Sequence, residues 1–120
     1  MQLELAMIFV KDMPRMTAFY RDGLGLQLVL GESSAEWAVF EAGGARLALH
    51  AIPPAIAAGI TIADPADVRS ETPIKLVFRA DDLDAACARL VALGAQLLPA
   101  RATERRDLVD PEGNVLQLTT

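Results

Sequence analysis

Few side chains in this chain have the types and spacing needed for catalytic or metal chemistry. The 120 residues include one histidine, His50, and one cysteine, Cys87. A single histidine excludes zinc sites of the HExxH type, and a single cysteine excludes an internal disulfide and a cysteine-rich zinc site. Ser33 and Ser34 lack the GxSxG context of an activated serine, and no GxGxxG or phosphate loop is present. The sequence therefore carries none of these local catalytic or metal-binding motifs.

Three short segments alternate apolar side chains with others, as half-buried strands do. They are ARLALH (45–50), PIKLVFRA (73–80) and NVLQLT (114–119). Their apolar sides should pack on helices, and their opposite sides form a mixed surface with Arg46, Ala48, His50, Lys75, Arg79 and Gln117. This surface is either ordinary solvent-exposed sheet or the wall of a ligand pocket, where polar groups usually lie among apolar ones.

The individual candidates each have a structural and a functional interpretation. His50 is a plain strand-end residue or a ligand-contacting or acid–base group, since the ordinary pKa of histidine, about 6.5, suits proton transfer. Lys75 and Arg79 are exposed charges or hold an anionic or carbonyl-bearing ligand. Trp37 is core or stacks on a ligand. Cys87 lies on the apolar face of a helix, which predicts a buried, inert thiol.

An internal repeat predicts the elements that position these residues. Asp12 aligns with Asp82 at an offset of 70, and Gly44 with Gly113 at an offset of 69. Each half then shows a strand, an aspartate-capped amphipathic helix that ends at glycine, and three short strands. The chain is therefore one domain of two β-α-β-β-β modules, 1–52 and 73–120, joined by the connection 53–72.

The connection 53–72 is longer than most loops in a compact domain, and it begins with apolar residues. It is either a linker with a short helical turn or a lid that packs against a ligand cleft or a partner subunit.

Composition favours a packed domain that does not bind nucleic acid. Hydrophobic residues make up 52%, the mean hydropathy is +0.30, the net charge is −5 and the pI is about 4.7. The acidic balance weighs against a nucleic-acid surface. No apolar run reaches the length of a membrane span, and the first residues carry Glu4 instead of a basic leader. We expect a soluble, cytoplasmic protein.

Three segments resemble the vicinal oxygen chelate superfamily, which includes glyoxalase I, extradiol dioxygenases and bleomycin-resistance proteins. They are FYRDGLGL (19–26), VFRADDLDAACARLVALGA (77–95) and DPEGNVLQL (110–118). The resemblance implies an α+β fold in which two tandem βαβββ modules form an open, cup-shaped, mixed eight-stranded sheet with the helices outside. It also implies a homodimer and a ligand within the cup.

The same resemblance implies where a divalent metal would bind. The first-strand positions are Leu5 and Lys75, and the fourth-strand positions are Ala48 and Gln117. Only Gln117 is able to coordinate, because Leu5 and Ala48 have no donor and a protonated lysine has no lone pair. His50 with Gln117 is a poor ligand set. We therefore predict no metal cofactor.

These observations predict a small-molecule-binding protein of this superfamily without its metal centre, and they leave open whether it catalyses any reaction. The alternatives are a metal-dependent lyase, isomerase or dioxygenase with an altered site, and a non-catalytic regulatory or partner subunit. The predicted ligand-binding residues are Leu5, Trp37, Arg46, Ala48, His50, Lys75, Arg79 and Gln117.

Overall fold

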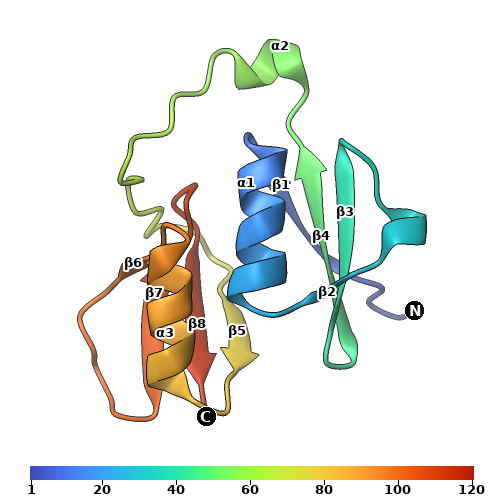
Figure 1. The fold of residues 1–120 in the computed structure, drawn as a ribbon. Helices are drawn as coiled ribbons and strands as arrows, with labels where there is room; N and C mark the ends of the chain where they lie inside the picture. Colours follow the sequence, from blue (N-terminus) through green and yellow to red (C-terminus); the bar gives the residue numbers. More distant parts are fainter. The chain divides into compact units, whose positions relative to one another are not determined.

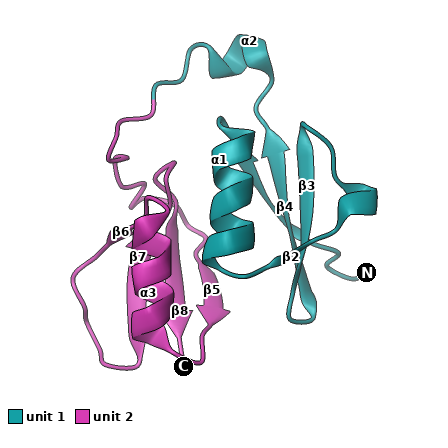
Figure 2. Cartoon of the chain, in the orientation of Figure 1, with its two compact units in different colours: residues 1–61 teal, residues 62–120 magenta.

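The computed structural model describes residues 1–120 and contains two four-stranded sheets (Figure 1). The chain divides into two compact units, which we call unit 1 (Met1–Thr61) and unit 2 (Ile62–Thr120) (Figure 2). Each unit holds one sheet and one main helix in the order βαβββ. The predicted α+β class with two such modules is therefore confirmed, with the eight strands divided between two sheets. None of the helices combines the length and the apolar character that crossing a bilayer requires.

Unit 1 has the strand order β1-β4-β3-β2, with β1 parallel to β4 and the other neighbours antiparallel. The helix α1 (Met13–Ala18) continues into a π-helical turn at Phe19–Gly23, and a short 3₁₀ turn follows the second strand. Its strands are β1 (Ala6–Val10), β2 (Gln27–Leu28), β3 (Trp37–Ala42) and β4 (Ala45–Ala51).

Unit 2 repeats this topology with the order β5-β8-β7-β6. Its helix is α3 (Leu83–Ala92), and its strands are β5 (Leu76–Arg79), β6 (Gln96–Leu97), β7 (Arg105–Val109) and β8 (Val115–Thr119). The parallel register also repeats, because Met7 pairs with Ala48 in unit 1 and Val77 pairs with Gln117 in unit 2. These pairs have the offsets of 70 and 69 that the sequence repeat predicts.

The helices begin where the aspartates predict them. The Asp12 carboxylate accepts a hydrogen bond from the Arg15 N–H at 3.1 Å, and the Asp82 carboxylate accepts one from Ala85 at 2.9 Å. Such caps satisfy backbone donors that the first helical turn leaves unpaired. Gly94 follows α3 with a φ of 100°, a conformation that glycine adopts readily.

The core of each unit lies between its helix and one face of its sheet. In unit 1 the rings of Phe19 and Tyr20 are buried, with centroids 5.3 Å apart, and Tyr20 lies 6.5 Å from Phe40. In unit 2 the α3 residue Leu90 is fully buried, as is Leu108 of β7. Burial of each large apolar side chain contributes roughly 1.5–3 kcal/mol. The rings of Phe19 and Tyr20 thus serve the packing of the helix on the sheet.

Cys87 lies on the same buried face of α3 as Leu90. Burial raises the pKa of its thiol; the Arg106 charge lowers that pKa and Asp84 raises it. A buried thiol whose pKa is raised is a poor nucleophile, which agrees with the inert role predicted from the sequence.

Two turns hold the hairpins together. Gly43 and Gly44 have φ values of 62° and 95° and connect the paired residues Ala42 and Ala45. In unit 2 the turn after β7 is organised by Asp110, which is fully buried. Its carboxylate accepts hydrogen bonds from the Glu112 N–H, the Asn114 N–H and the Asn114 side-chain amide, at 2.9, 2.9 and 2.8 Å.

The connection contains the predicted short helical turn, α2 (Pro54–Ala57). Its later part packs on unit 2, because the Arg69 N–H donates to the Gly113 carbonyl at 2.9 Å and the Gln96 side-chain amide donates to the Ala66 carbonyl at 2.6 Å. Residues 62–72 are therefore integrated into unit 2 and do not form a free linker.

The second strand of each module has only two residues, although the sequence around it alternates apolar and other side chains over a longer stretch. The segment LQLVLGE forms only the two residues of β2 before the 3₁₀ turn at Leu30–Glu32. The segment QLLPARA forms only the two residues of β6, because Pro99 follows closely and has no N–H for a ladder.

Candidate functional site

Each sheet has an open face, by which we mean the side opposite the one packed on its helix. In unit 1 this face carries a row of three rings, because Phe9 and Trp37 both pair with His50 across neighbouring strands. The His50 ring lies 5.2 Å from Phe9 and 5.4 Å from Trp37, the latter edge-to-face. We call Phe9, His50 and Trp37 the aromatic row. Phe9 is 51% exposed, so the row offers apolar ring surface to solvent.

The next row of this face is apolar. Met7 pairs with Ala48, which pairs with Val39. Ala48 is fully buried and Met7 is exposed. Leu5 immediately precedes β1, and strand alternation places it with Met7. The two positions of unit 1 that the superfamily resemblance associates with a metal, Leu5 and Ala48, are thus hydrocarbon.

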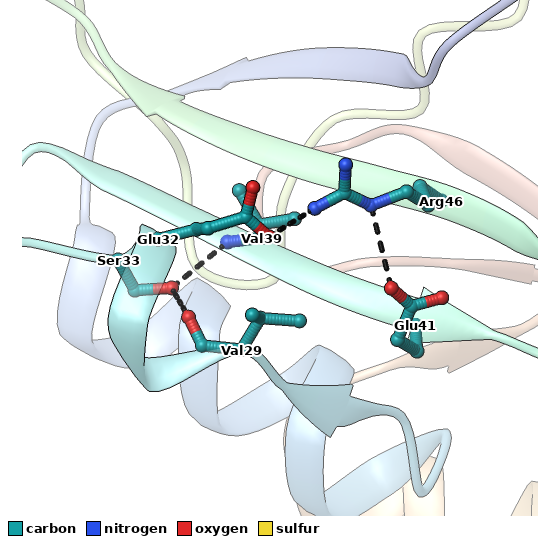
Figure 3. Close-up of polar contacts among 6 residues, drawn as sticks. All are labelled: Val29, Glu32, Ser33, Val39, Glu41 and Arg46. Carbon is teal, nitrogen blue, oxygen red and sulfur yellow. Dashed lines mark hydrogen bonds and ion pairs between the residues drawn. The ribbon is translucent and has the colours of Figure 1, made fainter.

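Arg46 is held by two carboxylates on the same face (Figure 3). Its guanidinium forms an ion pair with Glu32, and its Nε lies 3.4 Å from Glu41 Oε1. Because both carboxylates offset its charge, Arg46 would have to give up a partner to bind an anion. Figure 3 also shows Ser33, whose Oγ donates to the Val29 carbonyl at 2.7 Å and accepts from the Val39 N–H at 3.1 Å, a structural role.

The open face of unit 2 carries a polar network around Asp107. Gln117 Nε2 donates to Asp107 Oδ1 at 2.8 Å, and Lys75 Nζ lies 3.2 Å from Asp107 Oδ2. The Asp107 side chain is 20% exposed and that of Lys75 is 40% exposed. The sequence analysis missed Asp107, although alternation in RRDLV and its pairing opposite Gln117 place it on this face.

Arg79 lies on the same face, at the end of β5. It pairs with Thr119, which pairs with Arg105 on the other side. The structure thus gathers Leu5, Trp37, Arg46, Ala48 and His50 on the open face of unit 1, and Lys75, Arg79 and Gln117 on that of unit 2. Phe9 and Arg105 also lie on these faces and were not among the residues predicted from the sequence. The alternation of side chains along β1 and β7 would have placed them there.

The residues at the four expected metal positions do not fit a divalent cation. Two are hydrocarbon, and the Lys75 ammonium already lies against the neighbouring carboxylate, where it would repel a cation. Gln117 offers one amide oxygen while its nitrogen donates to Asp107. No three His, Cys, Asp or Glu side chains gather closely enough to hold a metal ion.

The βαβββ repeat with parallel outer pairs defines a class of protein, and comparison with known proteins gives the family. The profile of the glyoxalase-like domain family matches residues 5–119. The chain therefore belongs to that family and to the vicinal oxygen chelate superfamily. A comparison with curated protein sequences gave no significant match.

Solved structures show the same fold. A glyoxalase/bleomycin resistance protein/dioxygenase family enzyme from Burkholderia phytofirmans PsJN is 22% identical, with a TM-score of 0.73 over 98% of this chain and 97% of that one. The fosfomycin resistance protein FosX from Listeria monocytogenes, complexed with Mn(II) and a sulfate ion, is 19% identical, with a TM-score of 0.71 over 99% and 89%. A glyoxalase-related enzyme from Fulvimarina pelagi is 23% identical, with a TM-score of 0.69 over 98% and 88%.

Proposed function

We propose that this chain is a small-molecule-binding protein that works without the divalent metal centre of its superfamily. The observation that carries the proposal is the donor set, because Leu5, Ala48 and Lys75 supply no ligand atom for a cation. The contact between Lys75 and Asp107 supports the proposal further. Asp107 is the carboxylate hydrogen-bonded to Gln117, and the Lys75 ammonium already offsets its negative charge.

The candidate binding surfaces in this proposal are the open faces of the two sheets, each taken by itself. On unit 1 the aromatic row combines exposed ring surface with one imidazole, and on unit 2 the Asp107 network holds polar groups. Pockets for small molecules usually combine apolar area with a few fixed polar groups in this way.

Metal analysis tests the metal-free part of the proposal. We expect purified protein to contain no stoichiometric metal and to bind Mn²⁺ weakly in an electron paramagnetic resonance titration. The double variant Leu5→His with Ala48→Glu places two donors on neighbouring strands and should raise Mn²⁺ affinity, with each single variant as control. Stoichiometric metal in the wild type would overturn the proposal in favour of a metal-dependent lyase, isomerase or dioxygenase.

Intrinsic fluorescence tests ligand binding, because Trp37 is the only tryptophan of the chain. A small-molecule screen by thermal shift should yield stabilising compounds. We expect these to change Trp37 emission in the wild type and to bind more weakly to Phe9→Ala. Leu30→Ala, which removes an exposed apolar side chain from the 3₁₀ turn, is the control. If no compound stabilises the protein, a regulatory or partner-subunit role gains support.

The proposal includes a homodimer and a cytoplasmic location. Light scattering coupled to size-exclusion chromatography measures the first, with a mass of twice 12.8 kDa expected. Fractionation of cells that express a tagged chain measures the second.

A further inference from the structure

A row of two guanidiniums and one hydroxyl lies at one end of the open face of unit 2. Arg79 of β5 and Arg105 of β7 both pair with Thr119 of the strand between them, so the three side chains share a face. The two arginine Cα atoms are thus separated by two strand spacings, roughly 10 Å. Long arginine side chains easily reach across that distance to a group above Thr119.

Neither arginine side chain forms a hydrogen bond or ion pair within the chain, although the protein as a whole carries a net charge of −5. Asp107, the acidic residue of β7 on this face, already has one oxygen accepting from Gln117 and the other beside Lys75. Glu104 precedes Arg105 and is exposed; hydrogen bonds from its own backbone N–H and from the Thr103 hydroxyl lower its pKa, and the Arg105 charge lowers that pKa further. Apart from this exposed neighbour of Arg105, no carboxylate offsets the positive charge of the row.

We infer that Arg79, Thr119 and Arg105 bind one compact oxyanion group, a carboxylate or a phosphoryl group, of a small ligand. Guanidiniums present pairs of N–H donors that match the oxygens of such a group, and the hydroxyl adds a further donor. The inference deepens the proposed function, since it names the chemistry of a ligand for the same open face.

The experiment is a titration of ¹⁵N-labelled protein with inorganic phosphate, and separately with acetate, followed by NMR at constant ionic strength. We expect saturable shifts of the Arg79, Arg105 and Thr119 amides. Arg79→Gln and Arg105→Gln should each weaken phosphate binding about fivefold, as expected for loss of one partly exposed charge contact. The relative affinities for phosphate and acetate show which anion the row prefers.

Arg101→Gln is the matched control, because it removes the same charge from the loop before β7. It should leave the affinity within about twofold. Equal weakening by Arg101→Gln, or shifts that do not saturate, would overturn the inference. Since the arginines lie on different strands, Arg105→Gln still decides the outcome if Arg79→Gln does not fold.

The two proposals fail in different ways. If phosphate and acetate do not bind, but the protein is metal-free and Trp37 responds to a ligand, only the anion row is wrong. If the protein contains stoichiometric metal, the proposed function is wrong, whatever the phosphate titration shows.

Discussion

The Asp110 carboxylate is fully buried and accepts three hydrogen bonds within one turn. It belongs to the segment DPEGNVLQL, one of those that carry the superfamily resemblance. In this structure the aspartate closes the turn between β7 and β8 and so fixes the register of Gln117 opposite Asp107. A motif used to recognise a family can therefore have a structural role and serve the site only indirectly.

Replacing this aspartate tests that role. Asp110→Ala leaves three donors without their acceptor and should lower the free energy of unfolding by about 3 kcal/mol, measured by urea denaturation. Asp81→Ala, a change at an exposed aspartate before α3, should cost less than about 0.5 kcal/mol. Similar losses in the two variants would contradict the structural role.

Lys75 makes a partly exposed ion pair, which contributes little to stability. Lys75→Ala should therefore lower the free energy of unfolding by less than about 1 kcal/mol while it changes which ligands bind. Urea denaturation and the thermal-shift screen measure the two effects. An unfolded Lys75→Ala protein would make this residue structural.

At the scale of elements, the sequence predicts much of this fold from local physics. The aspartate caps depend on neighbouring residues only, and strand alternation correctly separates Leu47 and Leu49 from Arg46 and His50. The partners of the site residues are not local. The contact of Lys75 with Asp107 joins strands that lie on either side of β8, and a single sequence gives no register between them.

Gly113 links the connection to the turn of unit 2. A Cβ at this position would lie 2.4 Å from the Asp67 carbonyl oxygen, whereas a Cβ at Gly44 would have nothing within 4 Å. Both glycines have almost the same φ, 94° and 95°, so the backbone strain of an alanine is matched.

Gly113→Ala should therefore lower the free energy of unfolding by roughly 2 kcal/mol more than Gly44→Ala, because it must displace the connection. Urea denaturation of the two variants measures the difference. Equal losses would show that residues 62–72 give way without cost.

The buried thiol on α3 predicts a pH dependence of stability. Since burial raises the pKa of Cys87 in the folded protein, the folded state disfavours the thiolate. The contribution of the protonated Cys87 thiol to the free energy of unfolding is complete below the ordinary cysteine pKa, about 8.5. It is lost as the pH rises through the raised pKa of Cys87 in the folded protein.

Wild-type protein should accordingly lose more unfolding free energy between about pH 7.5 and pH 10 than Cys87→Ala. Urea midpoints at the two pH values measure this difference. The change in unfolding free energy with pH is compared between the two proteins, so the pH-independent effect of the smaller alanine side chain cancels. An equal change in both proteins would contradict the prediction.

At the scale of the whole molecule, the net charge bears on which partners we expect. The net charge of −5 opposes association with a polyanion, even though the open face of unit 2 carries Arg79 and Arg105. We expect no saturable binding of a fluorescent duplex DNA up to about 10 µM protein at about 150 mM salt, measured by anisotropy. Binding that weakens steeply with added salt would contradict this expectation.

In both units alternate strand residues pack on the helix, and the intervening ones lie on the open face, where side chains such as Phe9 and Arg79 are exposed. A substitution among these exposed side chains changes the surface and leaves the packing under the helix as it was. Two copies of one scaffold can therefore differ on this side alone, and here the first copy carries aromatic rings and the second carries charged groups.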